Sequence, residues 1–286
     1  MREDRLTAPD GRRVAFAEFG DPAGLPIFHC HGSAESRLFA VEPRWTAGEA
    51  LRVVTIDRPG FGASSPLSGR TLLGWAADVA AVAAHLGIDE FSVLGWSGGG
   101  PHALALAHVL RPRVRAVAVV GGLGPTASVS GALEALDPGR RFIAELAPKD
   151  PAAAAALVEE FATGWVADPD TFTLGGESPP ADVAVLAHPE WGENLRAQIR
   201  EGLRAAAGVA WDAACVYGSW GFDPAGLDVP AFVWHGDDDR VNVVEHGRWL
   251  AGTVPGAVYH EVAGAGHFVI YPRWREIVME VADASR

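Results

Sequence analysis

One pentapeptide constrains the fold of this chain more than any other segment. Residues 95–99 read Gly-Trp-Ser-Gly-Gly and match G-x-S-x-G; an apolar run precedes them at 91–94, and a helix-compatible segment follows at 102–108. A strand, a tight turn and a helix in that order are the context of a nucleophile elbow, whose strained turn projects the serine hydroxyl into a cleft. Alone, the pattern also fits a glycine-rich turn with no catalytic role, so the choice between the two depends on residues elsewhere in the chain.

The segments around the pentapeptide alternate between strand and helix patterns. Residues 5–7 and 13–19 flank a Pro-Asp-Gly turn and predict a hairpin. Four short apolar runs predict buried strands at 25–30, 51–56, 91–96 and 114–120. We expect a short helix over 45–50 and an amphipathic helix over 71–86 with Thr71 as its N-cap. This alternation predicts a mostly parallel sheet flanked by helices on both faces.

The alternation stops after residue 124. Residues 125–215 contain no convincing strand; Asp150-Pro151 favours a helix start, and Leu195, Ile199 and Leu203 recur with helical spacing. Strand patterns return at 231–235 and 257–262, with helices expected over 243–250 and 272–284. We therefore predict an α/β core from residues 1–124 and 216–286, with residues 125–215 inserted as a helical cap whose breaker-rich loop lies at 175–180.

Composition excludes several classes of partner. The net charge of −13 argues against binding to nucleic acid or to an anionic membrane surface. No apolar run is long enough to span a bilayer, and the charged N-terminus lacks the apolar region of a secretory signal. Cys30 and Cys215 are far apart and expected to be reduced. These features predict a cytoplasmic protein that acts on a small molecule; they leave its oligomeric state open.

A serine nucleophile needs a base, and the base needs an orienting acid. In a parallel sheet these residues belong in loops at the carboxyl ends of later strands. Residues 236–241 read Gly-Asp-Asp-Asp-Arg-Val and follow one predicted strand, whereas Gly266-His267 follows the next. The chain order is therefore Ser97, an aspartate and His267, with Asp237, Asp238 and Asp239 all available as the acid.

These segments together resemble the α/β-hydrolase superfamily. The matching pieces are His31-Gly32-Ser33, the Asp-Arg-Pro-Gly-Phe-Gly loop at 57–62, and the segments at 95–99, 236–241 and 266–267. The chain is most similar to the cofactor-free group of esterases, perhydrolases and C–C hydrolases with a helical cap. The resemblance implies Asp239 as the acid, three residues after Gly236. It also implies that the N–H groups of Ser33 and Gly98 form an oxyanion hole, although Ala34 stands where the group often has proline.

We expect Ser97 to attack the carbonyl of an ester, thioester or lactone of a small, largely apolar substrate, because a serine nucleophile indicates acyl chemistry. The alternatives on the same residues are C–C bond hydrolysis, acyl transfer and perhydrolysis. A non-hydrolytic ligand-binding or cyclising protein is a further alternative. Candidates to line an apolar pocket are the tryptophans Trp96, Trp165, Trp191, Trp211 and Trp220, for which simple packing of the cap is an equal alternative.

No cofactor is expected. The glycine-rich segments at 60–62 and 98–100 fit neither a dinucleotide-binding fingerprint nor a phosphate-binding P-loop with lysine. His29 and His31 share one face of a predicted strand, but no further ligand follows at the spacing of a metal site. The sequence therefore predicts neither a nucleotide nor a metal site.

Overall fold

The structure is a computed structural model of the whole chain, and it describes residues 1–39, 48–174 and 177–286. The described residues form a sheet of eight strands. In chain order the strands are β1 (Arg2–Thr7), β2 (Arg13–Gly20), β3 (Leu25–Cys30), β4 (Leu51–Ile56), β5 (Phe91–Trp96), β6 (Val114–Val120), β7 (Ala231–Gly236) and β8 (Val258–Val262).

The strands lie across the sheet in the order β1-β2-β4-β3-β5-β6-β7-β8. Strand β2 pairs antiparallel with β1 and with β4, and every pair from β4 to β8 is parallel. The mostly parallel α/β sheet is thus confirmed. Since β3 to β8 run the same way, the loops after them emerge at one edge of the sheet, which is where ligand sites of such sheets form.

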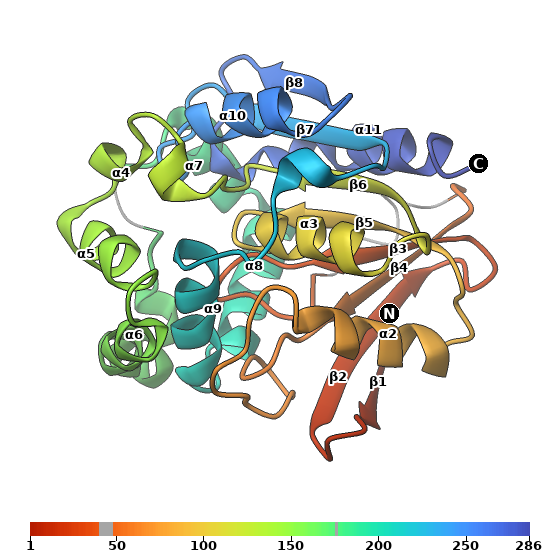
Figure 1. Cartoon of the computed structure of the whole chain (residues 1–286), viewed down its shortest axis with the longest axis horizontal. Helices are drawn as coiled ribbons and strands as arrows, with labels where there is room; N and C mark the ends of the chain where they lie inside the picture. The colour runs from red at the N-terminus through yellow and green to blue at the C-terminus, as the bar shows by residue number, and fades with distance from the viewer. Residues whose placement is uncertain (40–47, 175–176) are drawn as a thin grey trace.

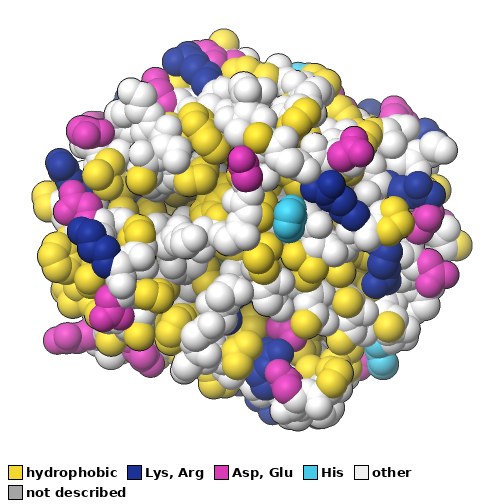
Figure 2. Space-filling model, viewed as in Figure 1, with side chains coloured by type: hydrophobic (Ala, Val, Ile, Leu, Met, Phe, Trp, Pro, Cys, Tyr) yellow, Lys and Arg dark blue, Asp and Glu magenta, His cyan; other side chains and the backbone are white. Residues whose placement is uncertain are grey.

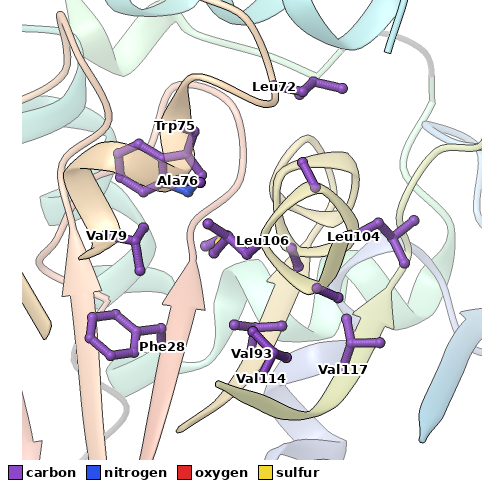
Figure 3. Close-up of a cluster of buried hydrophobic side chains, with 14 of the residues drawn as sticks. Phe28, Leu72, Trp75, Ala76, Val79, Val93, Leu104, Leu106, Val114 and Val117 are labelled. Carbon is purple, nitrogen blue, oxygen red and sulfur yellow. The ribbon is translucent and has the colours of Figure 1, made fainter. Parts of the chain in front are cut away.

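Among the described residues, four helices cover the two faces of the sheet (Figure 1). They are α2 (Trp75–His85), α3 (Gly99–Val109), α10 (Glu245–Thr253) and α11 (Ile270–Asp283). Side chains of α2, α3 and α10 pack with Val93 of β5 in one buried cluster, part of which Figure 3 shows, whereas α11 packs with Leu94 in another. Neighbouring residues of a strand point to opposite faces, so an unbroken apolar strand such as β5 serves both clusters.

A block of helices lies between β6 and β7 in the sequence, and we call residues 125–222 the helical insertion. Its helices gather toward the left of Figure 1. They are α4 (Ala132–Ala135), α5 (Pro138–Leu146), α6 (Pro151–Ala167), α7 (Pro180–Ala187), α8 (Pro189–Gly202) and α9 (Ala207–Tyr217). Asp150 caps α6 by accepting a hydrogen bond from the Ala153 N–H (2.9 Å), with Pro151 at the first helical position.

Some expectations differ from the structure or fall partly outside the described residues. Helix α2 begins at Trp75 rather than at 71, because Thr71 caps the turn before it: its hydroxyl accepts a hydrogen bond from the Gly74 N–H (3.0 Å). Residues 45–47 of the helix expected over 45–50 lie outside the described residues, and residues 48–50 are not helical. Residues 175–176, at the start of the loop expected at 175–180, also lie outside the described residues.

The surface carries no dominant patch of one charge on the face drawn in Figure 2. Lys and Arg side chains lie beside Asp and Glu side chains, with apolar side chains between them. The excess of acidic residues is therefore not gathered into one region of this face. Among the described residues, no helix combines the length and the apolar character needed to cross a membrane.

Candidate active site

Ser97 lies on a sharp turn between β5 and α3. Its φ angle is +53°, a left-handed backbone conformation that residues other than glycine rarely adopt. Two glycines make the turn possible: a Cβ on Gly95 would lie 2.3 Å from the Gly99 carbonyl oxygen, and one on Gly99 would lie 2.0 Å from that of Cys30. The close approach of strand and helix thus holds Ser97 in a strained position at the carboxyl edge of the sheet.

The serine hydroxyl belongs to a chain of hydrogen bonds between three loops. Ser97 Oγ lies 2.9 Å from His267 Nε2, and His267 Nδ1 lies 2.9 Å from Asp239 Oδ2. The three residues follow β5, β8 and β7, and all three are buried. The imidazole therefore has its two nitrogens between a hydroxyl and a carboxylate, the geometry in which it can accept a proton from the hydroxyl.

Asp239 is the carboxylate that contacts the histidine. Its other oxygen, Oδ1, accepts hydrogen bonds from the N–H groups of Val241 and Asn242, both at 2.9 Å. Burial by itself raises the pKa of Asp239, but His267 and the hydrogen bonds from His235 and His267 outweigh it and hold that pKa well below its usual value. Asp239 is consequently ionised at neutral pH.

The neighbouring aspartates point elsewhere. Asp237 accepts a hydrogen bond from the Gly264 N–H (2.7 Å), and Asp238 forms an exposed ion pair with Arg240 (2.9 Å). Of the three carboxylates left open by the sequence pattern, these two therefore brace surface turns.

Ser33 and Gly98, the expected oxyanion-hole residues, lie next to each other. A Cβ on Gly98 would be 3.4 Å from the Ser33 nitrogen. The loop after β3 is strained at Ala34, whose φ is +67°. His31 steadies this loop, because its Nδ1–H donates to the Gly32 carbonyl (2.8 Å).

A buried ion cluster connects the Ser33 loop to the helical insertion. Asp212 on α9 accepts a hydrogen bond from the Ser33 hydroxyl (2.8 Å), is held by two nitrogens of Arg58 (both 2.8 Å), and pairs with Arg70 (2.9 Å). Burial opposes ionisation of Asp212, but Arg58, His102 and Arg70 together keep its pKa far below the ordinary value. No motif or spacing in the sequence indicated this cluster.

Replacing Asp212 by asparagine should destabilise the protein by about 3–5 kcal/mol, since it leaves two buried guanidinium groups without a carboxylate. The measurement is the midpoint of urea unfolding, followed by circular dichroism. The matched control is Asp170→Asn, which removes an exposed ion pair to Arg200 and should leave the midpoint nearly unchanged. Equal midpoints for the Asp212 and Asp170 variants would contradict this role.

A second carboxylate of the insertion contacts the histidine loop. Asp182 on α7 accepts hydrogen bonds from the N–H groups of His267 and Phe268, both at 2.9 Å. Burial raises the pKa of Asp182, and these two N–H groups partly offset that effect. The insertion thus contacts both the loop of His267 and the loop of Ser33.

Two cavities meet at Ser97. Both are lined by Ser33 and Ser97; one has a volume of about 200 Å³ and the other about 530 Å³. The walls of the smaller are mainly apolar: Trp96, Leu186, Leu195, Ile199 and Phe268. Those of the larger include Ile143, Val158, Trp165, Val209 and Val216, with Arg140 and Tyr217 among its polar residues.

Only part of the expected tryptophan set reaches these cavities. Trp96 lines the smaller one and donates a hydrogen bond to the His267 carbonyl (3.1 Å), and Trp165 lines the larger. Trp191, Trp211 and Trp220 line neither of these two cavities, so their place in a substrate pocket stays a prediction.

Packing explains each exception. Trp191 stacks on His188 with ring centroids 4.1 Å apart, and Trp211 packs against α6. Trp220 is buried in the core, where its ring nitrogen donates to the Val216 carbonyl (3.0 Å). These rings join the insertion to the core or to itself, the alternative that the sequence analysis had left open.

The described residues contain no group of three or more His, Cys, Asp or Glu side chains arranged to hold a metal ion. Cys30 and Cys215 are both free and buried. Neither cysteine takes part in the hydrogen-bonded chain at Ser97.

The fold and the site define an α/β protein with a serine on a strand–turn–helix elbow. A sequence model of the alpha/beta hydrolase fold family matches residues 26–273. The chain therefore belongs to the alpha/beta hydrolase fold family.

Individual relatives are distant. A non-heme haloperoxidase from Rhodococcus erythropolis is 25% identical over 267 residues, which cover 87% of this chain and 86% of the relative. Among solved structures, an esterase from Rhodococcus sp. ECU1013 is similar with a TM-score of 0.68, and a thermophilic esterase from Thermogutta terrifontis with 0.67. Both are 24% identical and aligned over the whole of both chains, so they support the fold rather than a particular substrate.

Proposed function

We propose that the protein is a serine hydrolase that cleaves an ester, thioester or lactone of a small, largely apolar substrate through an acyl-enzyme on Ser97. The observation that carries this proposal is the hydrogen-bonded chain from Asp239 through His267 to Ser97. The two cavities that meet at Ser97 support it, because an ester places one group on each side of its carbonyl.

In the proposed reaction His267 takes the Ser97 proton while the hydroxyl oxygen attacks the carbonyl carbon. The resulting imidazolium is stabilised by Asp239 and returns the proton to the leaving alcohol or thiol. A water molecule, activated by the same imidazole, then attacks the acyl-enzyme and releases the acid. The N–H groups of Ser33 and Gly98 would bind the oxyanion, each contributing about 2.7–4 kcal/mol to the barrier reduction. The helical insertion serves as the cap over both cavities.

Fluorophosphonate labelling tests the nucleophile directly. We expect the intact mass to rise by one probe adduct, and peptide mapping to locate that adduct on Ser97. A panel of esters, thioesters and lactones with graded acyl chains then identifies the reaction. Labelling at Ser97 without turnover of any panel member would favour a ligand-binding or cyclising protein, and absence of labelling would contradict the proposal.

Perhydrolysis is the second candidate, favoured by the similarity to the haloperoxidase along most of the chain. In this reaction hydrogen peroxide replaces water, so the acyl-enzyme yields a peracid. The two functions separate in one assay: peracid and acid formed from the same ester are compared as peroxide concentration rises. Peracid as the dominant product at millimolar peroxide would favour perhydrolysis.

Asp182 is proposed as a positioning residue for His267. Replacement by alanine removes the acceptor of two backbone N–H groups and should lower kcat by about 10–100-fold with little change in KM, because a small displacement of the imidazole misaligns proton transfer. Asparagine, which keeps one acceptor oxygen, should have an intermediate kcat. The control Asp150→Ala removes an N-cap remote from Ser97 and should leave kcat unchanged. A rise in KM alone for Asp182→Ala would contradict the positioning role.

A further inference from the structure

The smaller cavity beside Ser97 is lined by a buried carboxyl group that the proposed mechanism does not use. Glu35 lies just after the Ser33 loop, is only 2% exposed, and lines this cavity together with Trp96 and Phe268. Its Oε2 accepts a hydrogen bond from the Gly32 N–H (2.8 Å). Within the described parts of the chain, its other oxygen, Oε1, has no hydrogen-bond partner.

The protonation of this carboxyl group follows from its surroundings. Burial raises the pKa of Glu35 to about 8, although the Gly32 N–H and the Arg58 charge both act in the opposite direction. The neutral form is therefore well populated near pH 7. Since Oε2 already accepts a hydrogen bond, the acid proton belongs on Oε1, which then can both donate and accept.

The charges around the same cavity restrict what it can bind. Besides Glu35, the carboxyl groups of Glu177 and Asp182 line it, and Arg240 is the one cation among its described lining residues. Arg240 is already paired with Asp238. Oxygen acceptors thus outnumber positive groups, and this arrangement favours neutral or cationic hydrogen-bond donors over anions.

We propose that Glu35 is a specificity-determining residue: the smaller cavity takes a short apolar portion of the substrate that bears a hydroxyl or amino group, and Glu35 Oε1 hydrogen-bonds to that group. This inference rests on the proposed hydrolysis at Ser97. A hydroxyl group can both donate to and accept from Oε1, and an ammonium group would form an ion pair with the ionised carboxylate. An alkyl group of the same shape would leave a buried carboxyl group unpaired, so the site should discriminate against it.

The experiment compares esters that differ by one hydroxyl group. On the acyl side the pair is ethyl 3-hydroxybutanoate and ethyl 3-methylbutanoate; on the alcohol side it is 2-hydroxyethyl and propyl butanoate. Ethyl 3-aminobutanoate supplies the cationic group. For the wild type we expect kcat/KM at least tenfold higher for the hydroxyl member of one pair, and the pair concerned identifies which side of the ester occupies the cavity.

Two variants separate recognition from support of the loop. Glu35→Leu should abolish the hydroxyl preference while retaining turnover of the alkyl esters. Glu35→Gln keeps an acceptor for the Gly32 N–H and should retain the hydroxyl preference but lose at least tenfold on the amino ester. The matched control is Glu193→Leu on the exposed side of α8, which should leave every ratio unchanged. Circular dichroism checks that the variants fold.

The outcomes distinguish this proposal from the proposed function. If Ser97 is not labelled by fluorophosphonate in the wild type, hydrolysis at Ser97 itself is wrong. If Ser97 is labelled and alkyl esters are cleaved, but neither pair shows a hydroxyl preference, only the role of Glu35 is overturned. A Glu35→Leu variant that slows both members of a pair by the same factor would likewise assign Glu35 to support of the Gly32 loop alone.

Discussion

The Ser97→Ala variant is expected to fold like the wild type and to lose ester hydrolysis by about 10⁴–10⁶-fold, the loss typical of removing a serine nucleophile. The hydroxyl makes its hydrogen bond to His267 and lies at the junction of two cavities, so its removal disturbs little packing. Alanine can occupy the same left-handed conformation at a strain cost similar to that of serine.

Initial rates on 4-nitrophenyl butanoate and the urea midpoint together test this expectation. Fluorophosphonate titration of the variant measures any contaminating wild-type enzyme, whose activity would otherwise be mistaken for residual activity of the variant. The control Ser130→Ala removes an exposed hydroxyl of the insertion and should change neither quantity. A Ser97→Ala rate above a few per cent of wild type, at unchanged stability, would falsify the assignment of the nucleophile.

The sheet was predictable because its determinants are local. Apolar runs of five to seven residues correspond to β3 to β7 within one residue at each end. The start of α6 followed from Asp150-Pro151, whose capping chemistry involves only near neighbours in the sequence. Thr71 shows the limit of such signals, because a cap of a preceding turn and a cap of a helix have the same local pattern.

The sequence alone could predict that Ser97, Asp239 and His267 lie close together, because each follows a strand of one parallel sheet. It could not predict the polar residues that surround them. Asp212 meets Arg58 across a separation of 154 residues, and nothing in the spacing of either predicts the pair. The one available signal was a single carboxylate in the otherwise apolar helix α9. Glu35 carried no signal, because its burial depends on how the insertion closes over the Ser33 loop.

Two carboxylates of the helical insertion contact the loops that carry His267 and Ser33. Asp182 holds the backbone at His267, and Asp212 holds the hydroxyl of Ser33. An insertion that only covered the substrate would not need to contact the loops of His267 and Ser33. In the proposed reaction, displacement of α7 or α9 would therefore move the loop of the base, His267, or that of the oxyanion donor, Ser33.

The Asp239→Asn variant should lower kcat by about 10⁴-fold at neutral pH, the loss typical of this substitution in a serine triad. The amide can keep its oxygen toward the N–H groups of Val241 and Asn242, which then turns its NH₂ group toward His267 Nδ1. An NH₂ donor requires Nδ1 to accept, so the ring proton moves to Nε2. In that tautomer the imidazole cannot take the proton of Ser97.

Asp237→Asn and Asp238→Asn are the matched controls, since they make the same chemical change one and two positions away. Asp237 braces the Gly264 turn and Asp238 pairs with Arg240 at the surface, so each variant should keep kcat within a few-fold of wild type. Fluorophosphonate labelling rates should fall with kcat for Asp239→Asn alone, because labelling needs the same proton transfer from Ser97. If either control were the crippled variant, the hydrogen bond between Asp239 and His267 would not be the one that orients the base.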